Sequence, residues 1–329
     1  MRKKSNTTKT TRKSGKRRTG KALLITILVI IIAAFLVALS PLFLPRATAN
    51  RVTSTVEKIV GVDSVVNKGY KNLLAFLQDF TKNIRPASSA TESAPRIEGL
   101  EIPAYVEGHE VVRHTGYTLS WNEQHLVADW VAYELTATEL DTQESSRSED
   151  FRPDESVRRS SQLDDYRGSG YSRGHLAPAQ DFKWSANAMS DTFYLTNMVP
   201  QEQDNYNGGI WLKAENATRD CARITGTVYV VTGPVLTDGP FETIGANKVT
   251  VPKQCYKALL IIDTDGTVQT IAMSIPQTAK KKESISNYLM TVDELEKLTG
   301  LDFFIELDDE IEKAAESKYD IDFWPKSFR

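Results

Sequence analysis

One short segment, GYSRGHLAPAQDF at residues 170–182, combines several reactive side chains. Its first five residues spell G-x-S-x-G, the pattern in which some hydrolases expose a nucleophilic serine, here Ser172. The same segment places an arginine and a histidine two positions apart, Arg173 and His175. An arginine binds phosphate oxygens in a planar fork, and a neutral imidazole accepts a proton from water near neutral pH. The segment therefore indicates either a serine nucleophile or a histidine base.

The surroundings of Ser172 do not support a serine nucleophile. A nucleophile elbow needs a strand before the serine and a helix after it. Residues 164–169, DDYRGS, have no strand character, and Pro178 is unfavourable in a helix that begins near Ser172. That fold also needs a histidine later in the chain, and only His175 follows, too close in sequence to serve. We therefore expect His175 to act as a base.

A second set of side chains recurs at intervals of four residues: Asn207, Trp211, Glu215 and Arg219. On an α-helix, steps of four drift by about 40°, so these residues would form one slowly turning stripe. An amphipathic helix with a buried tryptophan and solvated polar residues explains the same spacing. The stripe also fits a hydrated Mg²⁺ site, because Mg²⁺ keeps several waters and needs few protein ligands. Asn207 would then bind directly and Glu215 through water, with Arg219 facing phosphate.

The elements that must position these side chains form a mixed pattern. Residues 204–223 contain helix formers after Gly209, and residues 285–300 predict a helix in which Thr291 and Glu294 form a capping box. Runs of β-branched and aromatic residues predict strands in four segments: two strands joined by a turn within 117–136, and one each in 225–236, 255–263 and 268–276. We expect an α+β domain whose sheet core is mostly antiparallel.

Four motifs in this order together resemble the DNA/RNA non-specific endonucleases, the ββα-metal nucleases that include endonuclease G. They are SRGHLAPAQD (172–181), FYLTNMVPQ (193–201), N-x3-W-x3-E-x3-R (207–219) and VYVVTGP (228–234). The resemblance covers roughly residues 100–305. It implies a sheet core that carries a ββα-metal, or His-Me finger, active-site motif.

The resemblance also implies roles for individual residues. His175 matches the general base that activates water, and Asn207 matches the sole direct protein ligand of a divalent ion, Mg²⁺ with Mn²⁺ as a substitute. The remaining matches are Arg173 beside the phosphate, Asn197 in the supporting network, Glu215 on metal-bound water, Arg219 on the phosphate side and Arg147 stabilising charge in the transition state.

Three features of this chain leave alternatives open. Arg152 lies close in sequence to Arg147 and competes for its role. The segment after Asn197 is one residue longer than the family pattern, so Asn205 competes with Asn207, and the spacing to Trp211 favours Asn207. The family motif usually begins with aspartate, where this chain has Ser172; the change is expected to weaken or retune metal binding.

The implied reaction is metal-dependent hydrolysis of phosphodiester bonds. Contacts to phosphate read neither base nor sugar, so DNA and RNA, single- or double-stranded, are all expected substrates. The alternatives are a membrane-tethered protein that binds or takes up nucleic acid without catalysis, and a surface protein in which the nuclease fold is a relic. The presence of both a base and a metal-binding asparagine favours the enzyme.

The N-terminal region differs in charge from the rest of the chain. Ten of the 40 Lys and Arg residues lie within residues 1–21, so residues 22–329 hold 30 against 43 Asp and Glu, a net charge of −13. An acidic body of this kind is not typical of a DNA-coating protein. Residues 22–44 are uncharged and long enough to cross about 30 Å of hydrocarbon. The sequence thus predicts a basic cytoplasmic tail, 1–21, and a transmembrane signal anchor, 22–44, with the remaining chain outside the cytoplasm.

Beyond the anchor, we expect a stalk and linker at 45–95 and the nuclease domain at 96–329. Two alternatives for the N-terminus remain: a secreted protein cleaved near Ala49, and a mitochondrial presequence with the domain at the inner membrane. The two cysteines, Cys221 and Cys255, do not form a C-x-x-C motif, which argues against a thiolate metal site. They would be either a disulfide or two buried thiols.

Overall fold

A computed structural model of the chain describes residues 99–329. The basic tail, the apolar run at 22–44 and the segment 45–95 lie outside the described residues, so the expected anchor and its topology stay predictions. Within residues 99–329, every helix is too short or too polar to span a bilayer.

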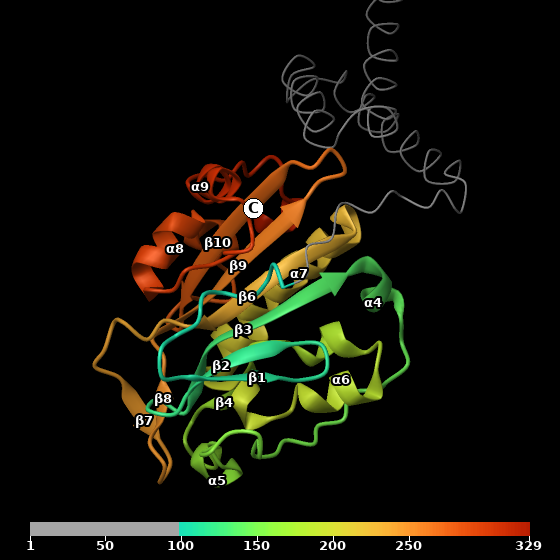
Figure 1. Cartoon of the computed structure of the whole chain (residues 1–329). Helices are drawn as coiled ribbons and strands as arrows, with labels where there is room; N and C mark the ends of the chain where they lie inside the picture. The colour runs from blue at the N-terminus through green and yellow to red at the C-terminus, as the bar shows by residue number, and fades with distance from the viewer. Residues whose placement is uncertain (1–98) are drawn as a thin grey trace, which may run out of the picture. The chain divides into compact units, whose positions relative to one another are not determined.

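The core of the described region is one seven-stranded sheet in which all neighbouring strands are antiparallel, as the sequence predicted. Figure 1 shows the long central strands side by side. In spatial order the strands are β1 (Glu110–Arg113), β2 (Thr118–Asn122), β3 (Val127–Thr136), β6 (Thr227–Pro234), β9 (Gln254–Ile262), β10 (Val268–Pro276) and β11 (Leu289–Met290).

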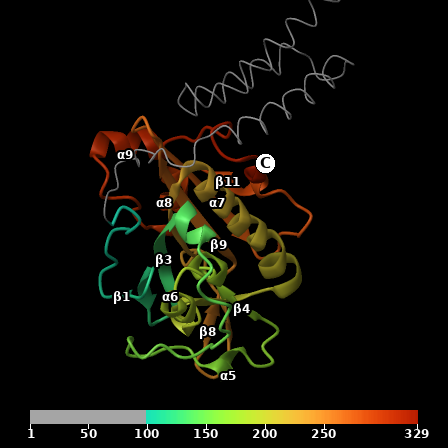
Figure 2. The same ribbon diagram turned by 90° about the vertical axis from the view of Figure 1, so that its right-hand side faces the viewer.

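Helices cover both faces of this sheet. Along β6, Val228 and Val230 belong to the apolar cluster that contains the buried residues of α7 (Leu212–Thr225). Tyr229 and Val231 alternate with them and pack with α8 (Val292–Thr299). Because successive side chains of a strand point to opposite faces, α7 and α8 lie on opposite sides of the sheet (Figure 2).

Shorter elements complete the described region. Two small antiparallel pairs lie outside the main sheet: β4 (Ser172–His175) with β5 (Met198–Gln201), and β7 (Glu242–Ile244) with β8 (Val249–Val251). The remaining helices are α4 (Ala137–Asp141), α5 (Leu163–Tyr166), α6 (Ala186–Asp191), α9 (Asp309–Glu316), the 3₁₀ turns η1 (Ala179–Phe182), η2 (Leu195–Asn197), η4 (Ile285–Tyr288) and η5 (Lys326–Phe328), and the π-helix η3 (Gln203–Trp211).

The helix expected over residues 285–300 is shorter than predicted. Its capping box is present, since Thr291 and Glu294 each bond the backbone N–H of the other. However, Leu289 and Met290 form the edge strand β11 against β10. Pairing with an open sheet edge outweighs local helical periodicity here, and α8 begins only at Val292.

The cysteines are buried thiols and do not form a disulfide. Cys221 lies on α7 and Cys255 on β9. Burial raises the pKa of the Cys255 thiol to about 12, so this side chain behaves as a small apolar group.

Candidate active site

The segment that contains the histidine forms a strand. In β4, Ser172 pairs with Gln201 and His175 with Met198 of β5. A Cβ at Gly174 would lie 2.1 Å from the Gln201 side chain, so the glycine of the R-G-H motif allows the two strands to approach. Ser172 begins this strand instead of occupying a strand-to-helix turn, which excludes the nucleophile elbow.

His175 is enclosed by two aromatic rings. The centroid of its ring lies 5.8 Å from that of Phe151 and 5.1 Å from that of Phe193, both in edge-on contact. The side chain is buried, and its Nε2 has no hydrogen-bond partner among the described residues. Burial, followed by the charges of Arg147 and Arg173, lowers the pKa of His175 to about 3. The imidazole is therefore neutral at physiological pH.

Both arginines that act on His175 lie over the same aromatic rings. The guanidinium carbon of Arg173 is 4.1 Å from the ring centroid of Phe151, and that of Arg147 is 5.0 Å from Phe193. Arg147 also pairs with Glu149 at 3.2 Å. Arg147, Phe151 and Arg173 line a cavity of about 600 Å³. Arg167, which pairs with Asp164 at 2.9 Å, is a third arginine in this lining, whereas His175 lies behind the lining residues and is not one of them. Three cations beside a neutral histidine suit an anionic ligand.

The two phenylalanines that position these groups were not predicted from the sequence. Phe193 is the first residue of the FYLTNMVPQ motif, which was a signal that could have singled it out. Phe151 lies in a polar segment, and no spacing or periodicity relates it to His175.

The helix that carries Asn207 is not a continuous α-helix. The Asn207 N–H donates to the carbonyl of Glu202, five residues earlier, at 2.8 Å, as in a π-helix. Gly209 then adopts a non-helical conformation, and α7 starts at Leu212. The expected stripe from Asn207 through Glu215 is therefore wrong as a regular α-helical stripe. π-helical turns are frequent at functional sites, where they redirect a side chain.

Oxygen-bearing side chains from β4 and the π-helix meet in the cavity. Ser172 Oγ donates to Gln203 Oε1 at 2.5 Å, and Asn207 Nδ2 donates to the same oxygen at 3.1 Å. All three residues line the cavity. Because Asn207 uses its NH₂ group in this bond, its Oδ1 remains available as a ligand. Neutral oxygen donors of this kind suit a hard divalent ion such as Mg²⁺ or Mn²⁺ that keeps most of its waters.

Asn205 is used differently from Asn207. It does not line this cavity, and its backbone N–H donates to the carboxylate of Glu202 at 2.8 Å. Glu202 also accepts from the N–H groups of Asp204 and Tyr206, which caps the start of the π-helix. Of the two asparagines, only Asn207 lines the cavity, and the choice between them stays a prediction. Gln203, by contrast, was not singled out from the sequence.

Asn197 is buried and its side chain fixes the backbone beyond β4. Its Oδ1 accepts from the Ala177 N–H, and its Nδ2 donates to the Ala177 and Thr192 carbonyls, each at 2.9 Å. Ala177 is two residues from His175. The Trp211 indole donates to the His175 carbonyl at 3.4 Å. Asn197 and Trp211 thus bond the backbone at and just after His175.

Glu215 and Arg219 belong to a closed network of charges. Arg219, with 5% of its side chain exposed, bonds Asp181 and reaches Glu215 at 3.2 Å. Buried Lys257 adds a second cation and lies over the Trp211 ring. Neither Glu215 nor Arg219 lines the cavity. Burial raises the pKa of Glu215 and lowers that of Lys257 to about 8. The phosphate-facing position expected for Arg219 is not where this guanidinium lies.

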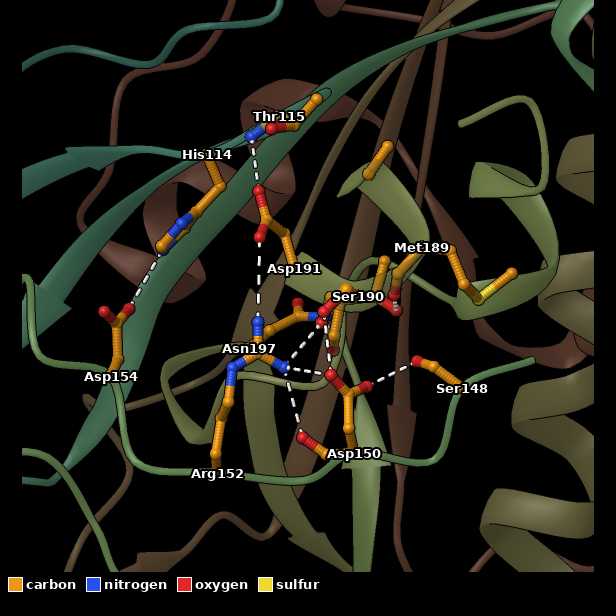
Figure 3. A network of polar contacts seen from close by, with 12 residues as sticks. His114, Thr115, Ser148, Asp150, Arg152, Asp154, Met189, Ser190, Asp191 and Asn197 are labelled. Atoms are coloured by element: carbon orange, nitrogen blue, oxygen red, sulfur yellow. Dashed lines mark hydrogen bonds and ion pairs between the residues drawn. The ribbon is translucent and has the colours of Figure 1, made fainter. Parts of the chain in front are cut away.

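Arg152 is likewise engaged with other protein groups (Figure 3). It donates to the Asp150 carboxylate at 2.8 Å and to the Ser190 carbonyl at 3.0 Å. Its guanidinium also lies 3.9 Å from the centroid of the Tyr194 ring. Because Arg152 has these partners and does not line the cavity, Arg147 is the better candidate for the upstream arginine.

Comparison with known proteins agrees with this geometry. Residues 101–310 match the DNA/RNA non-specific endonuclease family. A nuclease of Nostoc sp. is 35% identical over 217 residues, which is 62% of this chain and 76% of that protein. The mouse protein named nuclease EXOG, mitochondrial, is 34% identical over 239 residues, 68% of this chain and 64% of its own length.

Human endonuclease G, named as mitochondrial, is 34% identical over 200 residues, 57% of this chain and 67% of its own. Among solved structures, the crystal structure titled as the EndoG/EndoGI complex is similar to 60% of this chain and 86% of that chain, with 33% identity and a TM-score of 0.57.

Proposed function

The chain belongs to the DNA/RNA non-specific endonuclease family, and we propose that the cavity between β4 and the π-helix is its active site. The reaction of the family is metal-dependent hydrolysis of phosphodiester bonds in nucleic acids. The observation that carries the assignment is the neutral, buried His175 beneath two arginines, beside a cavity lined with amide and hydroxyl oxygens.

In the proposed mechanism, His175 accepts a proton from the attacking water. Its Nε2 is the nitrogen available for this step, since it has no partner among the described residues. Arg147 and Arg173 stabilise the negative charge that grows on the phosphate oxygens. Asn197 and Trp211 hold the backbone around the histidine, so its position does not depend on the substrate.

Asn207 would hold the divalent ion through Oδ1, with Ser172 and Gln203 beside it. We propose Mg²⁺, with Mn²⁺ as a substitute, and a bound ion would stabilise charge on the leaving oxygen. Ser172 supplies a hydroxyl where the family pattern has a carboxylate, so the cavity would hold the ion with less negative charge from the protein. The resemblance assigns Glu215 to metal-bound water, but its carboxylate does not line this cavity and accepts from Arg219.

The proposed substrates are DNA and RNA, single- or double-stranded. Three guanidinium groups, of Arg147, Arg167 and Arg173, line the cavity, and phosphate contacts carry little information about base or sugar. The acidic composition of residues 22–329 implies modest non-specific affinity that falls as salt rises.

For the location, we propose a single-pass protein whose residues 22–44 cross the membrane with residues 1–21 in the cytoplasm. Cleavage near Ala49 or delivery to mitochondria are the alternatives, and the second gains weight from the relatives named as mitochondrial. Protease added to intact cells removes an anchored extracytoplasmic domain and leaves an internal one whole, and a soluble mature chain that starts near Asn50 indicates cleavage.

The activity test is degradation of circular plasmid and of RNA by the full chain in detergent, with divalent ion, with chelator, and with His175→Ala. We expect cleavage of both substrates only by the unmodified chain with metal. Binding of plasmid without cleavage under all conditions would instead support a membrane-tethered protein that binds or takes up nucleic acid without catalysis.

A further inference from the structure

Three carboxylates converge on the face of the sheet opposite α7. Asp293 and Glu296 lie three residues apart on α8, and Glu316 is the last residue of α9. One carboxylate oxygen from each lies within 4.8 Å of the others. Residues at i and i+3 share one side of a helix, so Asp293 and Glu296 lie on the same side of α8. Figure 1 shows α8 and α9 near each other.

Glu316 is the least usual member of this acidic cluster, which we define as Asp293, Glu296 and Glu316. The residue is 3% exposed, and its Oε1 has no hydrogen-bond partner among the described residues. A buried carboxylate without a partner is costly, because its lost hydration is not replaced. Buried polar atoms of this kind call for a ligand or an ion.

No cation of the described residues compensates the cluster. None of its members forms a salt bridge with a lysine, arginine or histidine of residues 99–329. After burial, the groups that most strongly raise the pKa of Glu316, to about 9, are carboxylates: Glu296, Glu312, Asp293 and Asp302. Four carboxylates therefore repel the charged form of Glu316, so no single side chain accounts for the repulsion.

We propose that the acidic cluster of α8 and α9 is a binding site for a calcium ion. One carboxylate oxygen from each residue lies within 4.8 Å of the others, so small side-chain movements would let a single cation contact all three. Calcium accepts carboxylates in a flexible geometry, whereas Mg²⁺ demands a near-ideal octahedron and keeps several waters. Carboxylates are the ligands calcium prefers, and half-buried Asp293 and Glu296 leave a path from solvent.

The expected consequence of binding is a clamp between two helices that otherwise repel each other. The carbonyl of Ala315 accepts from Thr270 Oγ1 of β10 at 2.8 Å, so the end of α9 is already tied to the sheet. A bound calcium would join this end to α8. Since the site is separate from the cavity around Asn207, it stabilises the fold and does not take part in hydrolysis.

The test is the melting temperature of the full chain in detergent, first stripped of metal and then titrated with calcium. At calcium about 100-fold above its dissociation constant, we expect a rise on the order of 5–10 °C. Glu316→Gln and the half-exposed Asp293→Asn should each lose most of this rise. The matched control is Glu310→Gln, which changes an exposed glutamate of α9, the helix of Glu316, and should keep the calcium-dependent rise.

A second arm separates this site from the catalytic cavity, where a cation would also stabilise the protein. Asn207→Ala should retain the calcium-dependent rise, whatever its nuclease activity. The proposal is overturned if the unmodified chain shows no rise, in which case the carboxyl groups share protons instead. It is equally overturned if the rise survives both cluster variants, or is lost in Asn207→Ala. For a variant that is folded but melts at a lower temperature, calcium binding measured directly by calorimetry keeps the comparison interpretable.

Discussion

Arg173 and Arg219 belong to two of the four sequence motifs but face different surroundings. Arg173 is half-buried over the Phe151 ring, forms no ion pair with a described carboxylate, and lines the cavity. Arg219 is enclosed, with its guanidinium bonded to Asp181, Asn216 and Glu215. One arginine is available to a ligand, and the other is used by the fold. We call the residues that line the cavity the open side, and the buried charges around Arg219 the closed network. Changes on the open side should reduce activity, and changes in the closed network should reduce stability.

The largest effect is expected on the open side, from His175→Ala. Removing the proton acceptor should lower the rate of plasmid cleavage by about 10²–10⁴-fold, because phosphate contacts remain but proton transfer is lost. Single-turnover cleavage and nucleic-acid binding are measured together. Near-normal cleavage by this variant would refute the base assignment. Ser172→Ala is the companion variant and should keep substantial activity, since the serine is not a nucleophile.

In the closed network, Arg219→Ala should cost about 3–5 kcal/mol of unfolding free energy, since it leaves Asp181 and Glu215 buried with only Lys257 as a nearby cation. Urea unfolding measures this loss. Arg223→Ala is the matched control, because Arg223 is an exposed arginine on the same helix that pairs with Asp220 at 3.6 Å. An Arg219 variant that is fully stable but inactive would show that this arginine faces substrate after all.

Arg173→Ala should give the reverse result. We expect about a 10²-fold loss of cleavage, as for removal of one donor to a developing anion. The cost in stability should be only about 0.5–1 kcal/mol, the usual value of an exposed cation–π contact. Cleavage and urea unfolding of the same preparation decide the matter: a large loss of stability with intact activity would contradict the division into open and closed sides.

A smaller effect concerns pH. The pKa of His175 is about 3 in the folded chain against an ordinary value of 6.5, so between these values the unfolded chain binds more protons. The contribution of His175 is therefore neutral above pH 6.5 and increasingly destabilising as pH falls toward 3, by at most about 1.4 kcal/mol per pH unit.

This contribution is checked by unfolding at pH 7 and pH 5. His175→Gln should lose less stability than the unmodified chain between these values. Burial also lowers the pKa of His125, so His125→Gln should change the slope in the same direction. An unchanged slope in His175→Gln would mean that the histidine is not neutral by burial.

The strands were predictable because their β-branched and aromatic residues form local runs. The network around Arg219 was not, because its partner Asp181 lies 38 residues away in sequence. A four-residue period describes which side of a helix a residue occupies and does not say what covers that side. The same limit explains why Lys257, which comes from β9, was not connected with Glu215.

The candidate site was predicted in its components more than in its geometry. The types and order of His175, Arg173 and Asn207 were readable, whereas the π-helical turn that directs Asn207 into the cavity was not. A single-residue change in helical hydrogen bonding produces that turn, and propensities do not encode it. Phe151 and Gln203 contribute through contacts between elements, which also have no local pattern.

The most direct test of the central claim is the dependence of cleavage on metal concentration for Asn207→Ala beside Asn205→Ala. A single amide ligand dominates the protein's hold on an ion whose other ligands are waters and substrate. We predict that Asn207→Ala is inactive or needs much more Mg²⁺ or Mn²⁺, while Asn205→Ala retains the metal dependence of the unmodified chain. An inactive Asn205→Ala with an active Asn207→Ala, or no change in metal dependence in either, would contradict the account.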